Sequence, residues 1–386
     1  MPHILFKQDF TIKPHSQLSD GVFIDFIANG RFDQKIGIKK DDLEFLLLKK
    51  KTNDGYLLKY DKYSRISPVD HIKTAINQVA KSIPNNEIMF SNISSKTSKI
   101  SPNEAFLKDI DFFINDFDFN GEICIEVGFG SGRHILYQAK TNPNILFIGL
   151  EIHSPSLEQM LKQVKIQNIK NILAINYDAR LFLEFIKSNS ISKIFVHFPV
   201  PWPKKPHRRV YSKEFVDEAL RVLKPNGTLE LRTDDEDYYM FCKDLLECSD
   251  TKFEIFKNKD LDISSKYEDR WKKQEKNIYD LIATSITESS TKESTYKFDF
   301  IPIDFKKLAQ NFKQITVVED DFFIHFEDLY IIDEYNGLLQ VALGAKNKPE
   351  SKYILIKDGV GSYYQSSPTP SKTNFKAHQK IMEIIK

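Results

Sequence analysis

Cysteine is scarce in this chain, and long apolar runs are missing. Three cysteines among 386 residues, none at paired ligand spacing, argue against a disulfide framework or a zinc site and indicate the reduced thiols of a cytoplasmic protein. No apolar stretch approaches the roughly 20 residues that a membrane span needs. The first residues lack a basic region followed by an apolar core, so we expect neither a signal peptide nor membrane attachment.

An excess of charge of one sign is also lacking. The chain has 55 Lys and Arg against 54 Asp and Glu, which gives a formal net charge of +1. There is thus no global basic field, and a polyanionic partner must be met by a local patch. The hydrophobic fraction of 41% is enough for real cores. The length leaves room for two or three domains.

Two polar, serine-rich segments divide the chain into three blocks. We expect an N-terminal α/β extension over residues 1–95, a middle domain over 103–287, and a C-terminal β-rich extension over 295–386. In the first block, Asn53-Asp54-Gly55 predicts a hairpin turn. A helix with its apolar face at 72, 76, 79 and 83 follows, and Pro84 ends it. In the last block, Asn336-Gly337 predicts another hairpin, and residues 375–385 an amphipathic helix.

The middle block alternates strand-like and helix-like segments. The strand candidates are residues 123–127, 145–150, 172–176, 193–198 and 228–232. Regular alternation of this kind favours a parallel sheet that is covered by helices on both faces.

A glycine-rich turn follows the first of these strands. The run is Glu126-Val127-Gly128-Phe129-Gly130-Ser131-Gly132. A nicotinamide-binding turn would prefer glycine at position 133, where this chain has Arg133. Gly-x-Gly-x-Gly led by an acid is instead the pattern of S-adenosylmethionine methyltransferases. Glycines let the main chain approach the methionine portion without Cβ clashes.

Acidic residues follow three successive strands. Glu126 can accept from the cofactor's ammonium, directly or through water; Glu151 can accept both ribose hydroxyls; and Asp178 suits the adenine amino group. Taken singly, Glu151 is also explained as a solvated loop acid and Asp178 as a helix N-cap. Together they predict one row along the carboxyl edge of the sheet. We therefore expect an S-adenosylmethionine site that includes Gly128, Gly130 and Gly132.

The segment after the fourth strand is rich in proline and positive charge. Prolines stiffen it because each fixes φ, and Trp202 offers an apolar wall or a stacking face. Its four cations are Lys204, Lys205, Arg208 and Arg209. On an otherwise balanced chain they indicate a local phosphate-binding patch. A solvated surface loop is the alternative.

These motifs, in this order and spacing, resemble those of bacterial tRNA (guanine-N7-)-methyltransferases. The resemblance covers about residues 120–286, under half of the chain. The matching stretches are Glu126–Gly132, Gly149-Leu150-Glu151-Ile152-His153-Ser154-Pro155, Asp178-Ala179, Phe198-Pro199-Val200-Pro201-Trp202-Pro203-Lys204-Lys205, Arg208-Arg209, Arg232-Thr233-Asp234, Ser265-Lys266-Tyr267-Glu268-Asp269-Arg270 and Tyr279-Asp280-Leu281.

The resemblance implies a fold, a reaction and a set of roles. The fold would be a Rossmann-like class I methyltransferase core, a mostly parallel seven-stranded sheet with helices on both faces, carrying the two extensions. The reaction would transfer a methyl group from S-adenosylmethionine to N7 of the guanosine in the tRNA variable loop (position 46 in tRNA numbering), in the cytoplasm and without a metal. Substrate contacts would come from Lys204, Arg208, Arg209, Asp234, Ser265 and Glu268.

Val200 departs from the family pattern, whose loop reads Phe-Pro-Asp-Pro-Trp. The chemistry tolerates the change, because guanine N7 carries a lone pair and no proton, so attack on the methyl group needs no general base. Alignment of the reacting atoms helps, and carboxylates offset the positive charge that develops on the ring. Asp234 and Glu268 can do this while accepting from the guanine N1–H and 2-amino groups. Asp234 is alternatively the N-cap of the helix that follows it.

Two other functions remain open on the sequence alone. One is a methyltransferase for another nucleic acid or a small molecule; the other is a non-catalytic tRNA-binding protein, which Val200 would suit. His153 and His197 lack a second ligand at metal spacing, so we expect packing or hydrogen bonding from them. A monomer and a homodimer are both compatible with the sequence, and so is a tRNA-binding, dimerising or stabilising role for the extensions.

Overall fold

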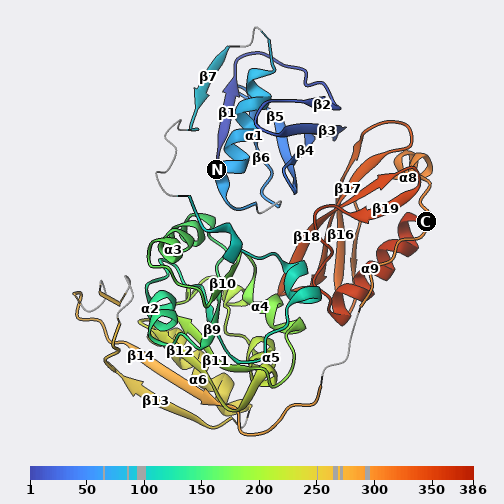
Figure 1. Cartoon of the computed structure of the whole chain (residues 1–386). Helices are drawn as coiled ribbons and strands as arrows, with labels where there is room; N and C mark the ends of the chain where they lie inside the picture. The colour runs from blue at the N-terminus through green and yellow to red at the C-terminus, as the bar shows by residue number, and fades with distance from the viewer. Residues whose placement is uncertain are drawn as a thin grey trace. The chain divides into compact units, whose positions relative to one another are not determined.

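The computed structural model describes residues 1–63, 66–84, 87–93, 101–249, 251–263, 268–269, 273–291 and 296–386. The chain forms two compact units. One is the continuous segment Ile100–Ser294, and the other combines both ends of the chain, Met1–Lys99 and Thr295–Lys386. The two terminal segments, which the sequence presents as separate extensions, thus lie in one unit. Figure 1 shows both units, with most of their helices and strands labelled.

The unit Ile100–Ser294 is built on a seven-stranded sheet in the order β10-β9-β8-β11-β12-β14-β13. The pairs from β10 to β12 are parallel, whereas β14 pairs antiparallel with both β12 and β13. The expected mixed α/β core is therefore present. The strands are β8 (Glu122–Val127), β9 (Ile145–Leu150), β10 (Ile172–Ile175), β11 (Ile191–His197), β12 (Leu223–Thr233), β13 (Phe253–Lys257) and β14 (Tyr279–Thr284).

Helices cover both faces of this sheet. Helices α2 and α3 pack on one face, and α4, α5 and α6 pack on the other. The helices are α2 (Arg133–Thr141), α3 (Ser154–Ile166), α4 (Ala179–Phe182), α5 (Lys213–Val222) and α6 (Glu236–Cys248), and the short turns are η1 (Glu104–Phe106), η2 (Phe112–Asp116), η3 (Leu183–Phe185) and η4 (Pro206–Arg208).

The sequence of β8 shows why the sheet is buried on both sides. Ile123 and Ile125 belong to the core under α4, α5 and α6, whereas Cys124 belongs to the core under α2 and α3. A central parallel strand therefore needs an almost unbroken apolar run. Burying each large side chain stabilises the fold by about 1.5–3 kcal/mol. This packing fixes the strand end, where the glycine turn begins.

The unit made from both ends of the chain holds a second, twelve-stranded sheet. Its main order is β19-β18-β17-β16-β3-β4-β5-β6-β1-β7, with β15 beside β16 and β2 beside β3. All of its pairs are antiparallel. The strands are β1 (His3–Phe6), β2 (Ser16–Gln17), β3 (Val22–Asn29), β4 (Asp33–Lys40), β5 (Leu43–Thr52), β6 (Gly55–Tyr60), β7 (Ile88–Ser91), β15 (Thr316–Val318), β16 (Phe323–Ile331), β17 (Gly337–Ala345), β18 (Lys348–Lys357) and β19 (Val360–Tyr363).

The two halves of this sheet meet between β3 and β16. Their backbone register there is a single pair, Asn29 with Ile331, but a shared apolar cluster joins side chains of both halves. A buried polar contact adds to it, because Asp61 accepts from Lys35 at 2.9 Å and from the Tyr353 hydroxyl at 3.0 Å. Helix α1 (Val69–Lys81) packs on the N-terminal half. Helices α8 (Phe305–Asn311) and α9 (Lys372–Ile385) belong to the C-terminal half.

Local patterns in the terminal segments are confirmed. The turn at Asn53-Asp54 joins β5 to β6, with Thr52 opposite Gly55. The expected hairpin at Asn336-Gly337 joins β16 to β17, and the two expected helices are α1 and α9. Helix α1 ends at Lys81, so position 83 lies beyond the helix and the expected end at Pro84 is three residues too late. The predicted linkers fall partly on residues 94–100 and 292–295, outside the described residues.

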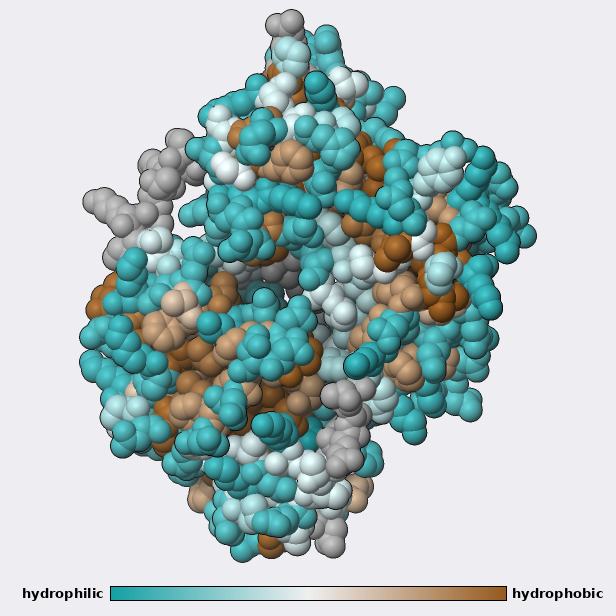
Figure 2. All heavy atoms as spheres, turned by 45° about the vertical axis from the view of Figure 1, so that its right-hand side comes forward, coloured by the Kyte–Doolittle hydropathy of each residue, from teal (hydrophilic) through white to brown (hydrophobic). Residues whose placement is uncertain are grey.

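The face of the molecule drawn in Figure 2 is mainly hydrophilic, with apolar side chains showing in patches. Within the described ranges, no helix combines the length and apolar character needed to cross a membrane.

Candidate cofactor and substrate site

The glycines of the turn after β8 have two different structural roles. Gly128, Gly130 and Gly132 all have positive φ, at 67°, 54° and 74°. A Cβ added at Gly128 would meet no atom within 4 Å, and one at Gly130 only the Gly128 carbonyl oxygen at 4.0 Å. A Cβ at Gly132 would lie 2.4 Å from Cγ of Met160 in α3. The first two glycines therefore leave open space for a ligand, while Gly132 allows α2 and α3 to pack closely.

Glu126 lies near the end of β8 and is almost completely buried, at 3% exposure. Its Oε2 is 2.8 Å from Nδ1 of His134, in the first turn of α2. A buried carboxylate needs such a partner, because an unpaired charge away from water is strongly unfavourable. The pair fixes the Glu126 side chain beside the glycine turn.

Glu151 follows β9 and binds the glycine turn directly. Its Oε2 accepts from the Gly130 N–H at 2.9 Å, and its Oε1 accepts from the His153 N–H at 2.8 Å. Glu151 is 8% exposed, so it is not the solvated loop acid of the alternative interpretation. A carboxylate offers about four lone-pair positions, so each oxygen keeps capacity for one further donor.

Asp178 follows β10 and is the N-cap of α4, where it accepts from the Arg180 N–H at 3.0 Å. It also binds the Arg180 guanidinium, with Nη2 at 2.7 Å from its Oδ2. The alternative interpretation of Asp178 as a helix N-cap is therefore confirmed. A role toward adenine would have to coexist with the Arg180 pair.

The three acids lie at one rim of the sheet. Glu126 is the penultimate residue of β8, and Glu151 and Asp178 follow β9 and β10. The three strands are adjacent and parallel. The Glu151 N–H also donates to the Ile175 carbonyl at 3.2 Å, which keeps the ends of β9 and β10 level. In open α/β sheets this carboxyl edge is where ligands bind.

The loop after β11 has an unusual backbone. Phe198 and Trp202 have positive φ, at 50° and 43°, which is uncommon for bulky residues and is associated with functional sites. The guanidinium of Arg208 lies 5.2 Å from the centre of the Trp202 ring. Val200 is 60% exposed. An apolar side chain thus faces solvent at the place of the family aspartate.

The four loop cations differ in exposure. Lys204, Lys205 and Arg208 are exposed. Arg209 is 9% exposed: its Nε donates to the Pro201 carbonyl at 2.8 Å, and its guanidinium lies 4.5 Å from the Phe241 ring centre. Arg209 therefore braces the loop against α6, and the other three cations carry the surface charge.

Asp234 follows β12 and is paired with Lys276, Oδ2 to Nζ at 2.9 Å. It is not the N-cap of α6, contrary to the alternative drawn from sequence. Asp235 fills that position and accepts from the Tyr238 N–H at 2.7 Å. The neighbouring acid satisfies the helix end, so Asp234 is not needed there.

Glu268 is 1% exposed and bound to Arg232, Oε1 to Nη2 at 3.0 Å. The other guanidinium nitrogen of Arg232 contacts both oxygens of Asp280, at 2.6 and 2.7 Å. Burial raises the pKa of Asp280 above its ordinary value even though Arg232 acts in the opposite direction. In this conformation Glu268 is part of a buried charge cluster. Ser265, the other expected substrate contact in this segment, lies outside the described residues.

Comparison with known proteins agrees with this geometry. A family described as "Putative methyltransferase" matches residues 120–281. A tRNA (guanine-N(7)-)-methyltransferase of Campylobacter jejuni is 44% identical over 100% of this chain and 99% of its own length. One from Wolinella succinogenes is 40% identical over 100% of both chains. The chain belongs to the tRNA (guanine-N(7)-)-methyltransferase family.

Membership of the tRNA (guanine-N(7)-)-methyltransferase family extends beyond the motifs. The sequence resemblance covers about residues 120–286, whereas these relatives, and one from Helicobacter hepaticus at 36% identity, align with the whole chain. The terminal segments are therefore shared with other members of the methyltransferase family. This agrees with their forming a single unit.

Four side chains that pair with the predicted site residues were not identified as their partners from the sequence. His134 binds Glu126, Arg180 binds Asp178, Lys276 binds Asp234, and Arg232 binds both Glu268 and Asp280. Arg232 is part of a motif quoted in the sequence analysis, but no role was assigned to it. Arg180 could have been suspected, because it lies only two residues after Asp178. No feature of the sequence marks His134 as the partner of Glu126, because a first-turn helix residue has many possible neighbours. The side chain of His153, as expected, makes a hydrogen bond, to Ser156 at 2.9 Å.

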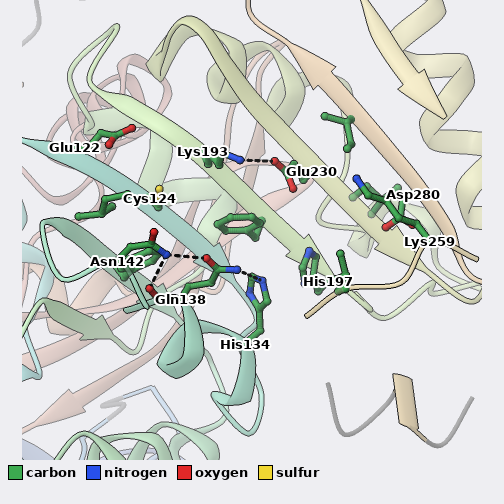
Figure 3. Close-up of a pocket in the computed structure, with 16 residues that line it drawn as sticks. Glu122, Cys124, His134, Gln138, Asn142, Lys193, His197, Glu230, Lys259 and Asp280 are labelled. Atoms are coloured by element: carbon green, nitrogen blue, oxygen red, sulfur yellow. Dashed lines mark hydrogen bonds and ion pairs between the residues drawn. The ribbon is translucent and has the colours of Figure 1, made fainter. Parts of the chain in front are cut away.

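A hollow of about 230 Å³ opens on the α2 side of the same sheet (Figure 3). Its wall includes the ion pair of Lys193 with Glu230, at 3.3 Å. Glu126, Glu151, Asp178 and Lys204 do not line it, so the hollow is distinct from the predicted rim site. His134 belongs to both places, because it lines the hollow and binds Glu126.

Proposed function

We propose that this protein transfers a methyl group from S-adenosylmethionine to N7 of guanine in tRNA. The observation that carries the proposal is the open cradle of Gly128 and Gly130, bordered by Glu151 at the carboxyl edge of the sheet. It is supported by the full-length similarity to tRNA (guanine-N(7)-)-methyltransferases. We also propose that residues 103–287 form a Rossmann-like class I methyltransferase domain, in keeping with the strand order and with helices on both faces.

The residues at the rim suit the methyl donor. Open space over two glycines lets a ligand approach the main chain. Glu126 would balance the ammonium group, Glu151 has lone pairs left for two ribose hydroxyls, and Asp178 would serve the adenine side. When bound, S-adenosylmethionine supplies an activated methyl group on its sulfonium sulfur.

The substrate side would hold guanine and the tRNA backbone. The exposed side chains of Lys204, Lys205 and Arg208 supply positive charge for phosphates. The Trp202 ring offers an apolar surface for the base, in a loop whose prolines restrict the backbone. Asp234, held by Lys276, would accept from the guanine edge and stabilise the positive charge that develops on the ring. No general base is needed, since N7 has no proton to lose, and the loop with Val200 remains compatible with turnover.

Glu268 would act differently from the first expectation. Its carboxylate is bound to Arg232 and buried, so we propose that it belongs to the charge cluster of Arg232 and Asp280. Its charge contributes to the field at the site without need for a direct contact with guanine. Because tRNA is the substrate, the proposed place of action is the cytoplasm.

The test is mass spectrometry of nucleosides from an unmodified tRNA transcript incubated with the protein and isotopically labelled S-adenosylmethionine. We expect labelled 7-methylguanosine from a transcript with guanosine in the variable loop. A transcript with adenosine at that nucleotide is the control and should yield none. Label in a nucleoside other than 7-methylguanosine would show that the protein methylates a different position and would overturn the proposed specificity. If the protein binds S-adenosylhomocysteine but transfers no label to tRNA, a non-catalytic tRNA-binding role is favoured.

A further inference from the structure

The pair of Glu126 and His134 holds an ionisable base directly beside the proposed ammonium position. The distance between Glu126 Oε2 and His134 Nδ1 is 2.8 Å, and both side chains are withdrawn from water, at 4% and 6% exposure. Glu126 lies in β8 at the turn, and His134 is the second residue of α2. Both ends of the pair are therefore fixed by the elements that form the glycine cradle.

The His134 ring has little freedom to turn away. It packs edge-on against Phe195, with ring centres 4.9 Å apart, and lies 4.5 Å from the ring centre of His197. Its Nε2 is 3.3 Å from the side-chain nitrogen of Gln138. Figure 3 shows the Gln138 side chain pointing toward His134, with His197 on the other side of the His134 ring. The Nδ1 face thus serves Glu126, while the Nε2 face borders the hollow.

The surroundings of His134 and His197 shift their pKa values in opposite directions. Burial disfavours a charged His134, but Glu126, with smaller contributions from Glu230 and Glu268, outweighs burial, and the pKa of His134 lies above its ordinary value of 6.5. Desolvation, followed by His134 and Arg232, holds the pKa of His197 well below its ordinary value. The other titratable or charged side chains that line the hollow or act on His134 are Glu122, Cys124, Lys193, Glu230, Lys259, Glu268 and Asp280.

We propose that His134 is a positioning residue for the cofactor, which orients Glu126 and gives up its Nε2 proton to solvent when the cofactor's ammonium binds. This inference rests on the proposed function, since it assumes that Glu126 serves that ammonium. The orientation of Gln138 in the structure, with its side-chain nitrogen 3.3 Å from Nε2, is that which suits the neutral ring. In the free protein the imidazolium balances the buried carboxylate, and the Gln138 amide is turned so that its oxygen accepts from Nε2–H. In the complex, the ammonium neutralises the charge of the Glu126 carboxylate, and Nδ1–H continues to donate to Glu126. The Gln138 amide nitrogen then donates to the deprotonated Nε2.

The proposal predicts a definite direction with pH. Two cations close to one carboxylate repel each other, so ammonium binding lowers the pKa of His134, and by reciprocity a protonated His134 weakens the binding. Affinity should therefore rise with pH through the pKa of His134 in the free protein. One exchanged proton limits the gain to about tenfold per pH unit.

Calorimetric titration with S-adenosylhomocysteine, which has the same ammonium, tests this in the full-length protein. The titration is run between pH 6 and pH 8.5 in pairs of buffers that differ in ionisation enthalpy. For the wild-type protein we expect tighter binding at higher pH and net release of protons. His134→Asn keeps an amide donor for Glu126 but cannot titrate in this range. It should bind with little pH dependence and release almost no protons.

Two further variants separate positioning from general damage. His153→Asn alters a histidine next to Glu151 that does not contact Glu126, and it should keep the wild-type proton release. His134→Ala removes the donor and should bind weakly at every pH, with His134→Asn restoring the affinity. Thermal unfolding of each variant reports whether the fold is intact.

The outcomes distinguish this inference from the proposed function. Equal proton release and equal pH dependence in the wild-type protein and in a folded His134→Asn would overturn the role of His134 and leave the methyltransferase proposal standing. Failure of the wild-type protein to bind S-adenosylhomocysteine would overturn the cofactor site itself. A change in unfolding temperature with unchanged proton release would reduce His134 to a structural residue and also overturn the inference.

Discussion

The Oε2 of Glu151 lies 2.9 Å from the backbone nitrogen of Gly130, so the acid at the end of β9 holds the glycine turn that follows β8. The other oxygen of Glu151 is bound to the His153 N–H. One side chain thus fixes the turn and the start of α3 at the same rim. A carboxylate that also served the ribose would complete the site without moving, which reduces the ordering required on binding.

Replacing Glu151 should separate cofactor binding from tRNA binding. Glu151→Ala removes the acceptor for Gly130 and for the proposed ribose hydroxyls. Hydrogen bonds to a charged group contribute about 1.5–3 kcal/mol each, so we expect affinity for S-adenosylhomocysteine to fall about 10- to 100-fold in calorimetry. tRNA affinity in a gel-shift assay should be unchanged. Glu122→Ala, at the opposite end of β8, is the control, and equal cofactor affinity in both variants would remove Glu151 from the site.

The glycines of the turn should respond differently to the same substitution. Gly128→Ala places a methyl group in the open cradle, so we expect at least a tenfold loss of cofactor affinity with about 1–2 kcal/mol of backbone strain. Gly132→Ala carries similar strain and also drives Cβ against Met160. Overpacking of this kind adds about 1–3 kcal/mol.

Thermal unfolding and calorimetry on both glycine variants distinguish the two effects. Gly132→Ala should show the larger drop in unfolding temperature, and Gly128→Ala the larger loss of affinity in the folded protein. The reverse order would mean that the ligand does not lie over Gly128.

Arg232 balances two buried carboxylates, Glu268 and Asp280. Arg232→Met leaves both without their cation, and removing one partner of a buried pair typically costs about 3–5 kcal/mol. We expect a lower unfolding temperature. Glu268→Gln should destabilise less, because Asp280 still pairs with the arginine.

The loss in Arg232→Met should depend on pH. Burial already raises the pKa of Asp280, so the folded chain holds that proton more tightly than the unfolded chain. This group therefore favours folding more as pH falls through its raised pKa. Without Arg232 the pKa should rise further, and the destabilisation should be larger at pH 8 than at pH 5. A loss that is independent of pH would contradict this account of the cluster.

The sequence was sufficient for features that depend on local pattern. The apolar run of β8, its glycine turn and the acids Glu126 and Glu151 at the ends of neighbouring strands all lie where the alternation of strand and helix places them. The hairpin at Asn53-Asp54 is equally local. These features follow from backbone geometry and from the burial of a parallel sheet on both faces.

Features that depend on distant partners could not be predicted. The pairing of Asn29 with Ile331 joins the two ends of the chain, and no local periodicity encodes it. The choice between Asp234 and Asp235 as the cap of α6 depends on a single residue of helix boundary, which is the least certain part of sequence interpretation. The buried cluster around Arg232 depends on side chains from three separate segments.

Lys204 should contribute to tRNA binding and not to cofactor binding. Its side chain is exposed on the loop after β11, and a phosphate contact there would release a condensed counterion. Lys204→Ala should weaken tRNA affinity several-fold at moderate salt and reduce the slope of log affinity against log salt by about 0.7–0.9. Affinity for S-adenosylhomocysteine should be unchanged. The control is Lys213→Ala, another exposed lysine, which lies in α5 and is paired with Asp217 at 2.7 Å. A wild-type salt slope in Lys204→Ala, with turnover also unchanged, would mean that tRNA does not contact this loop through Lys204.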